Sequence, residues 1–188
     1  GRENRVIGLS GRGCWLVSPH PALMKLPLLL SALLATAAFA GQPELLWETT
    51  GLAGPESVVF DAARQEYYVS NMGTYGKDAT PHDGFISRLS VDGKILELKW
   101  VAGLDDPKGL ALANGRLYVG DDPGMAEIDV AAGRLVAWHA PADGKGDFND
   151  CTADPAGNVY VCSGRLATVF RLHAGKFAPC LGVARGQI

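Results

Sequence analysis

Three similar hairpin turns recur along this chain at a nearly constant interval. Each has a glycine at its centre, and these glycines, 40 and 42 residues apart, are Gly93, Gly133 and Gly175. A second hairpin precedes each of them and leads into a Tyr-Val pair, at residues 68–69, 118–119 and 160–161. Two hairpins per period of about 41 residues make one four-stranded unit, which is typical of a β-propeller blade. The pattern therefore predicts an all-β chain that folds as a β-propeller.

About three four-stranded blades are expected, at approximately residues 55–101, 107–140 and 148–180. Propellers close with about 4 to 8 blades, so three blades leave apolar faces and strand edges uncovered. We therefore expect residues 41–188 to be a partial propeller, a truncated arc of a longer protein. Closure of one ring by two such arcs is the alternative.

The first 40 residues differ from the rest. Met24 and Lys25 precede an apolar run of 14 residues, which ends in Ala-Phe-Ala before Gly41. A basic start, a short apolar run and an Ala-x-Ala exit predict a signal peptide over residues 24–40, with a buried apolar helix as the alternative. Residues 1–23 are expected to be an upstream non-native or disordered segment. The export signal predicts a periplasmic or extracellular location.

The net charge of the segment that would remain after signal cleavage, residues 41–188, limits the kinds of partner it can bind. Residues 41–188 hold 13 basic and 19 acidic side chains. This negative balance argues against nucleic acid and against an anionic membrane surface. We expect no nucleic-acid partner, and no membrane attachment after signal cleavage.

Two sets of polar residues stand at equivalent positions of the three repeats. The channel-end residues, just before each innermost strand, are Glu56, Lys108 and Asn149. Innermost strands line the channel of a propeller, so we expect these side chains to converge there; a solvated lining without a ligand is the alternative. The strand-end residues, which follow the Tyr-Val pairs, are Asn71, Asp121 and Ser163. Their position favours a loop-capping role over a binding role.

The connection over residues 71–84 is about nine residues longer than its counterparts. By alternation of the strands it emerges on the same face as Glu56 and Asn149. Long insertions on one face often form a binding surface, and a tolerated surface insertion is the equal alternative.

Two segments resemble a known family. Residues 54–61 (Gly-Pro-Glu-Ser-Val-Val-Phe-Asp) and residues 148–161, which begin Phe-Asn-Asp-Cys, resemble motifs of the gluconolactonase, senescence-marker-protein and luciferin-regenerating-enzyme family. The resemblance implies a ring of six blades, of which three are present here, with one divalent cation in the channel and hydrolysis of lactones or related esters. It implies a metal-ligand role for Glu56 and substrate and water contacts for Asn149. The remaining ligands and the general base are expected beyond Ile188, so no catalytic residue is assigned.

The residue types suit this chemistry. Carboxylate and amide oxygens are ligands that Ca²⁺ or Mg²⁺ prefers, and such a cation polarises a carbonyl and activates water. Lys108 is a cation where a metal would be expected, so we assign it to substrate binding through a carboxylate, with pairing to Glu56 as the alternative. Because side chains alternate along a strand, Asp150 is expected to point away from Asn149 and to be structural.

Cys151 and Cys162 fall opposite each other if the hairpin between them centres on Ala156 and Gly157. Opposed strand positions are within disulfide range, and an exported protein could oxidise the pair. A disulfide is thus possible, but two reduced, buried thiols are the favoured interpretation.

Two functions follow from these observations. The first is a divalent-metal-dependent lactone or ester hydrolase, here incomplete, acting on a small lactone or a sugar-acid-like molecule. The second is a non-catalytic exported propeller that binds a ligand or a protein on its long-loop face, because a fold does not determine a function.

Overall fold

The computed structural model describes residues 6–9, 44–74, 77, 80–142, 144 and 146–182. Within these ranges the chain forms strands β1 to β14 and no α-helix. The all-β expectation is confirmed for this part of the chain.

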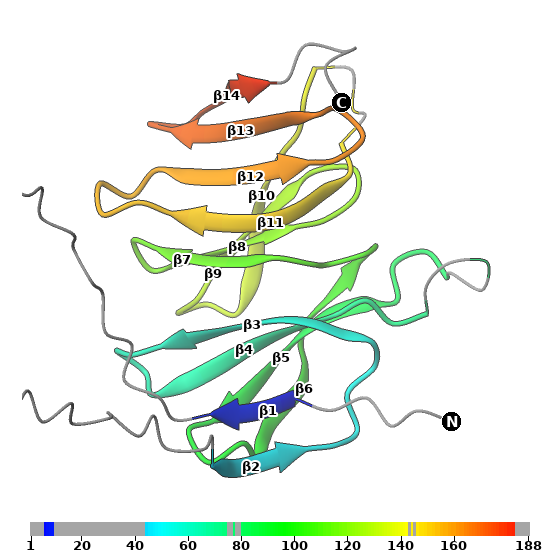
Figure 1. The fold of residues 1–188 in the computed structure, drawn as a ribbon, viewed down its shortest axis with the longest axis vertical. Coiled ribbons are helices and arrows are strands. Elements are labelled where there is room, and N and C mark those ends of the chain that lie inside the picture. Colours follow the sequence, from blue (N-terminus) through cyan, green and yellow to red (C-terminus); the bar gives the residue numbers. More distant parts are fainter. Residues whose placement is uncertain are drawn as a thin grey trace, which may run out of the picture.

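Twelve of the strands form three antiparallel four-stranded sheets, each a meander in which sequential strands are neighbours (Figure 1). The first sheet holds β3 (Pro55–Asp61), β4 (Glu66–Asn71), β5 (Gly84–Ser90) and β6 (Ile95–Leu104). The second holds β7 (Leu110–Ala113), β8 (Arg116–Gly120), β9 (Met125–Asp129) and β10 (Arg134–His139). The third holds β11 (Phe148–Ala153), β12 (Val159–Ser163), β13 (Thr168–His173) and β14 (Lys176–Gly182).

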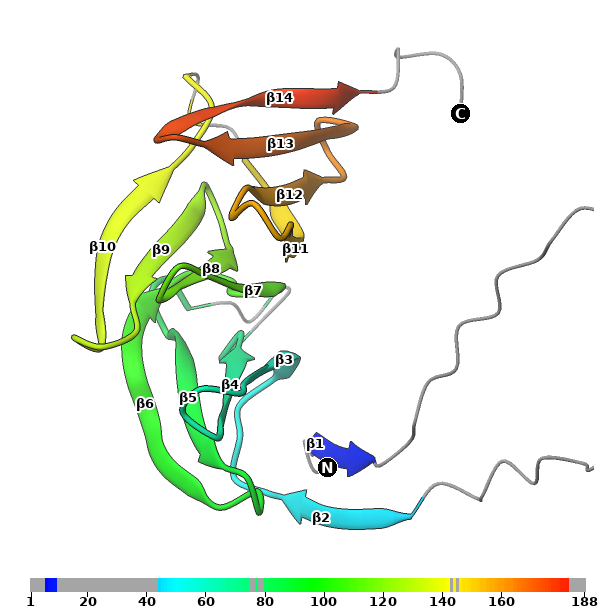
Figure 2. The ribbon, with the colours of Figure 1, turned by 90° about the vertical axis from the view of Figure 1, so that its left-hand side faces the viewer.

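The sheets follow one another around an arc (Figure 2). The first strand of each sheet, β3, β7 or β11, lies on the concave side, and β6 and β10 lie on the outside. This is the arrangement of propeller blades, and the expectation of three four-stranded blades is confirmed. A total of six blades stays a prediction.

The repeated glycines make the outer hairpin turns. Gly93, Gly133 and Gly175 have φ values of 77, 62 and 75°. Side chains other than hydrogen are disfavoured in this left-handed region, so the period seen in the sequence is a period of backbone geometry.

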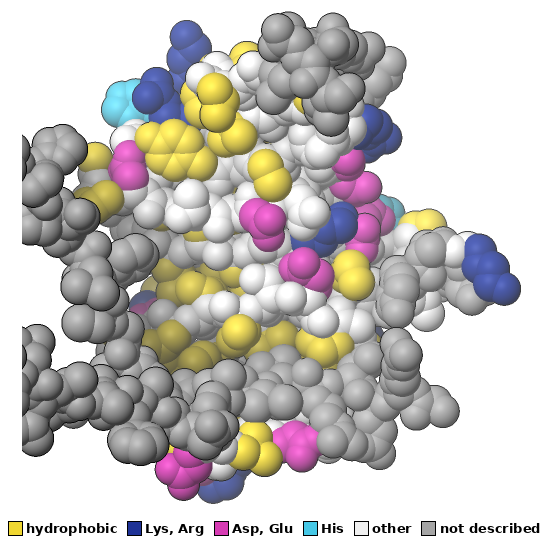
Figure 3. Space-filling view, viewed as in Figure 1, with side chains coloured by type: hydrophobic (Ala, Val, Ile, Leu, Met, Phe, Trp, Pro, Cys, Tyr) yellow, Lys and Arg dark blue, Asp and Glu magenta, His cyan; other side chains and the backbone are white. Residues whose placement is uncertain are grey.

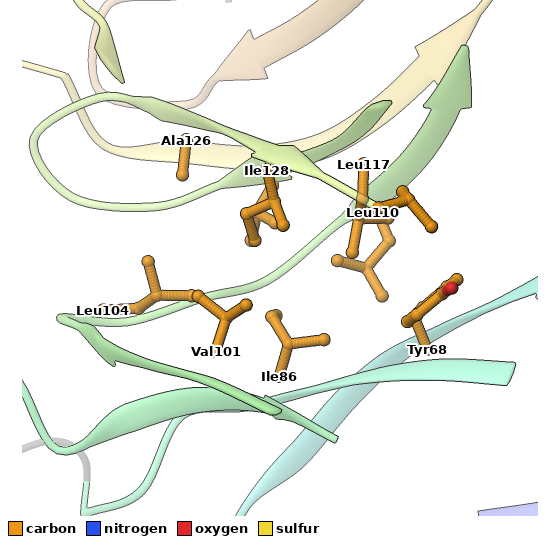
Figure 4. Packing of buried hydrophobic residues seen from close by; sticks show 10 residues of the cluster. Tyr68, Ile86, Val101, Leu104, Leu110, Leu117, Ala126 and Ile128 are labelled. Atoms are coloured by element: carbon orange, nitrogen blue, oxygen red, sulfur yellow. The ribbon is translucent and has the colours of Figure 1, made fainter. Parts of the chain in front are cut away.

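One apolar core lies between the first two blades (Figure 4). Tyr68 and Ile86 of the first blade pack in one cluster with Leu117 and Ile128 of the second. All four side chains are at most 1% exposed. Because neighbouring side chains of a strand point to opposite faces, the second blade supplies two cores, and Leu117 and Tyr118 belong to different clusters.

The second core joins the second and third blades. Met125 of β9 packs there with Phe148, Val161 and Phe170 of the third blade. The rings of Phe148 and Phe170 meet edge to face with centroids 5.4 Å apart. Aromatic pairs in this geometry add to the stabilisation that burial provides, so the two cores fix the order of the blades in the arc.

Apolar side chains are exposed at both ends of the arc, as expected for three blades. Val58 and Phe60 of β3 are 46% and 40% exposed, and Leu181 of β14 is 67% exposed.

A short strand precedes the first blade. Residues 6–9 form β1 (Val6–Leu9), which pairs antiparallel with β2 (Leu45–Thr49). A β-prone segment can pair in this way with the free backbone edge of β2. The expectation of a non-native or disordered segment over residues 1–23 stays a prediction, and apart from these four residues it lies outside the described residues. The predicted signal peptide, residues 24–40, lies outside the described residues, and no helix among the described residues is long and apolar enough to cross a membrane.

Candidate functional site

A buried polar side chain stands at the end of the second strand of each blade. Asn71 is 0% exposed, and its Oδ1 accepts a hydrogen bond from the Ala53 N–H over 3.0 Å. Asp121, also 0% exposed, accepts hydrogen bonds from the N–H groups of Asp105 and Asp106 over 3.1 and 2.5 Å. In both blades the side chain fastens the segment that leads into the innermost strand.

The third blade repeats this arrangement with another residue type. Ser163 is 2% exposed, and its Oγ donates to Asp147 Oδ1 over 2.5 Å. Asp147 directly precedes β11. The loop-capping role expected for the three strand-end residues is therefore confirmed.

The channel-end residues lie where the innermost strands begin. Glu56 and Asn149 are exposed side chains on β3 and β11. Lys108 lies two residues before β7 begins at Leu110. The structure thus brings all three to the same end of successive inner strands.

Matching irregularities in strand pairing shape this end of the first and third blades. The register of β3 against β4 shifts between Pro55 and Val58, and that of β11 against β12 shifts between Phe148 and Cys151. A β-bulge places an extra residue in one strand and re-aims its side chains, and bulges are common beside functional sites. Glu56 and Asn149 both lie within these bulges.

Asp150 lies beside Asn149 in the β11 bulge. Both side chains are exposed, so the burial does not alternate here as it does along a regular strand, and the charge of Asp150 helps to raise the pKa of Glu56. Sequence periodicity carries no signal for this.

Burial raises the pKa of Glu56, and the charges of Asp150 and then Asp106 raise it further, while Lys108 opposes them. Glu56 and Lys108 are therefore within electrostatic range of each other. No hydrogen bond or ion pair joins the described side chains of Glu56 and Asn149.

Lys108 is held by its own loop. Its Nζ lies 2.6 Å from Asp106 Oδ2 and donates to the Asp106 carbonyl oxygen over 3.1 Å. The side chain is 19% exposed. The alternative in which Lys108 forms an ion pair with Glu56 is therefore not seen.

Other acidic groups surround this end. Burial raises the pKa of Asp122. The charge of Lys108 opposes this shift, and the charge of Asp106 adds to it. The Oδ1 of Asp122 is buried and has no hydrogen-bond partner among the described residues. Figure 3 shows acidic side chains gathered toward the edge of the arc from which the β4–β5 loop projects. No group of three or more His, Cys, Asp or Glu side chains in the described ranges is placed to hold a metal ion.

The possible disulfide between Cys151 and Cys162 is not formed, in agreement with the favoured expectation of reduced thiols. Cys151 pairs with Val161 rather than with Cys162, and both cysteines are free thiols. The expected register assumed a four-residue link, whereas the structure pairs Ala153 with Val159 and leaves five residues in the turn. A slip of one residue turns a side chain to the opposite face, so the two thiols cannot face each other.

The comparisons with known proteins support the fold. No family model and no curated protein matches the sequence. Among solved structures, a gluconolactonase from Xanthomonas campestris is similar with a TM-score of 0.53 and 21% identity, over 77% of this chain and 53% of that one. A virginiamycin B lyase from Staphylococcus aureus is similar with a TM-score of 0.53 and 14% identity, over 70% of this chain and 42% of that one.

A chain of the nidogen–laminin complex is similar to the same degree, with a TM-score of 0.53 and 20% identity, over 71% of this chain and 48% of that one. This chain therefore spans about half the length of these structures. Together they show that the fold is that of a β-propeller.

Proposed function

We propose that this chain is part of a propeller hydrolase that opens small lactones or related esters at the channel end. One observation carries the proposal: Glu56 and Asn149 lie within matching bulges at the start of two inner strands. These bulges fall within the two segments that resemble gluconolactonase-family motifs. The similar gluconolactonase structure supports the fold on which this chemistry depends.

A divalent cation belongs to this proposal. The Glu56 carboxylate would hold it, since carboxylate oxygens suit Ca²⁺ and Mg²⁺. Desolvation, and after it the charges of Asp150 and Asp106, raise the pKa of Glu56, and a bound cation would favour the ionised carboxylate against both effects. The pairing of Lys108 with Asp106 also reduces the repulsion that its ammonium would exert on such an ion. When bound, the cation would polarise the lactone carbonyl.

The other two channel-end residues would position the substrate. The amide of Asn149 can donate to a substrate oxygen and accept from a hydroxyl. The Lys108 ammonium, partly exposed beside Asp106, would attract a carboxylate of a sugar-acid-like molecule. The proposal also requires further metal ligands and a general base besides these residues, and it includes a periplasmic or extracellular place of action.

Lactone hydrolysis tests the proposal in the protein extended to a closed ring of blades. We expect hydrolysis of an aldonolactone to stop on chelation, to return with Ca²⁺ or Mg²⁺, and to fall strongly in Glu56→Gln. Glu44→Gln removes the same charge from an exposed position before the first blade and should leave the rate unchanged. Activity that survives both chelation and Glu56→Gln would overturn the metal-dependent mechanism.

A second candidate is a non-catalytic module that binds a partner on its long-loop face. The similarity to a chain of the nidogen–laminin complex favours it, because that propeller was solved in complex with a protein. The two functions separate cleanly: a binding module shows no turnover of any lactone with either cation present.

A further inference from the structure

A cavity of about 340 Å³ lies between the first two blades, beside the channel end but apart from the channel-end residues. From the first blade it is lined by His82 of the β4–β5 connection, Gly103 of β6 and Asp105, which follows β6. From the second blade it is lined by Pro123 and Gly124 between β8 and β9, by Trp138 of β10 and by Ala140. Small-molecule sites begin at about 300 Å³ and combine an apolar lining with a few placed polar groups. Both features are present here.

One wall carries a paired imidazole and carboxylate. The His82 N–H donates to Asp105 Oδ1 over 3.0 Å, and His82 Nδ1 lies 3.0 Å from the same oxygen. The carboxylate favours the proton on Nδ1, which leaves Nε2 of the neutral ring as an acceptor. Neither His82 Nε2 nor Asp105 Oδ2 has a hydrogen-bond partner among the described residues. Two residues that line the cavity therefore each carry an acceptor atom that is free for a ligand, on side chains that are 70% and 31% exposed.

A buried carboxylate holds the backbone of Asp105 in place. The Asp105 N–H donates to the buried Asp121 Oδ2 over 3.1 Å. The backbone of His82 has a φ of 61°, a left-handed conformation that a side chain rarely adopts without support from its surroundings. The bond to Asp121 fixes the backbone of Asp105, and the contacts of Asp105 Oδ1 with His82 hold the two residues together.

The opposite wall is apolar. The Trp138 indole is 42% exposed. It rests against Gly124, where an added Cβ would lie 3.3 Å from Trp138 Cε3. The absence of a side chain at Gly124 lets the indole lie close to the β8–β9 connection, next to Pro123.

We propose that this cavity binds a neutral saccharide ring. A sugar ring has one face of C–H groups, which stacks on an indole, and an edge of hydroxyls. Two neighbouring hydroxyls would donate to Asp105 Oδ2 and His82 Nε2. The Asp105 carboxylate repels anionic ligands, so this site differs from the channel end, where Lys108 favours an acid. The proposal does not depend on lactone hydrolysis.

Titration of the 188-residue chain with neutral methyl glycosides, followed by ligand-observed NMR and calorimetry, tests this site. We expect saturable binding that weakens at least about tenfold, or about 1.4 kcal/mol, in Trp138→Ala and in Asp105→Asn, since the first removes the stacking surface and the second the charged acceptor. Asp92→Asn removes a carboxylate from an exposed turn far from the cavity and should bind as the parent does.

Circular dichroism and the melting temperature of each variant show whether it is folded. Because Asp105→Asn keeps the shape of the side chain, it decides the question should Trp138→Ala fail to fold. Absence of glycoside binding at tens of millimolar, or binding unchanged in Asp105→Asn, would overturn the proposal. Preference for small organic ammonium ions over glycosides would also overturn it, since those ions would use the carboxylate and indole without the imidazole acceptor.

Discussion

The amide N–H of Gly109 donates a hydrogen bond to the carbonyl oxygen of Asn149 over 3.1 Å. This bond joins the start of the second blade's inner strand to the bulge of the third. Gly120 lies on the other side of the same contact, where an added Cβ would be 2.2 Å from the Asn149 carbonyl oxygen. Because Gly109 and Gly120 have no side chains, the start of the second blade's inner strand and the end of β8 can both lie against the β11 bulge at Asn149.

Gly120→Ala should therefore destabilise the protein by about 1–3 kcal/mol, the usual cost of overpacking a filled interior. Urea unfolding monitored by circular dichroism measures this. Gly164→Ala is the matched control, since an added Cβ there meets nothing within 4 Å. Equal stability of the two variants would mean that the contact between β8 and the β11 bulge is looser than described.

Leu117→Ala should cost about 2–5 kcal/mol, as expected for a large-to-small change in a core. Leu117 is 0% exposed in the cluster that joins the first two blades. The same change at Leu96, which is 51% exposed on β6, should lie within about 0.5 kcal/mol of the parent. Similar losses at both sites would contradict the placement of the core between the blades.

Stability should fall as the pH rises from about 4 to 6 through the titration of Asp121. Burial raises the pKa of this carboxyl from 3.8 to about 6, against the opposing hydrogen bonds from the N–H groups of Asp106, Asp122 and Asp105. A folded-state pKa above the unfolded one favours the protonated folded protein, so this contribution is complete below pH 4 and lost above pH 6. It amounts to at most about 3 kcal/mol.

Asp121→Asn isolates that contribution. The variant loses one acceptor for the loop N–H groups, and it does not titrate in this range. The difference in unfolding free energy between parent and variant should therefore change between pH 4 and 6. A constant difference across this range would show that Asp121 titrates normally.

The thiols should be free and unequally reactive. Alkylation without reductant followed by mass spectrometry should label Cys180, which is exposed, well before Cys151. Burial raises the pKa of Cys151 and so suppresses its reactive thiolate. A species linking Cys151 to Cys162 would contradict the register of β11 and β12.

Much of the fold was readable from the sequence because local rules produce it. Gly93, Gly133 and Gly175 are needed for left-handed turns, and turns of one kind at one interval imply one repeated unit. The strand-end residues were also identified correctly, since a polar residue directly after a buried strand has few uses other than fastening the next loop.

The candidate site was harder to predict because it depends on offsets of single residues. Hydrophobic alternation gave no sign of the bulge that contains Asn149 and Asp150, nor of the five-residue turn that offsets Cys151 from Cys162. The cavity beside His82 and Trp138 was also missed, because its walls come from both blades and meet only after the blades have packed.

The fastenings made by Asn71, Asp121 and Ser163 each remain inside one blade. In each blade, hydrogen bonds from the blade's own strand-end residue therefore fix the position of the segment that leads into its inner strand. Gene duplication can therefore copy a blade whole, and the connecting segments on the working face can lengthen or diverge without shifting the strands beneath them. The extended connection of the first blade is one instance of such freedom, and new specificity can arise there at little cost to the scaffold.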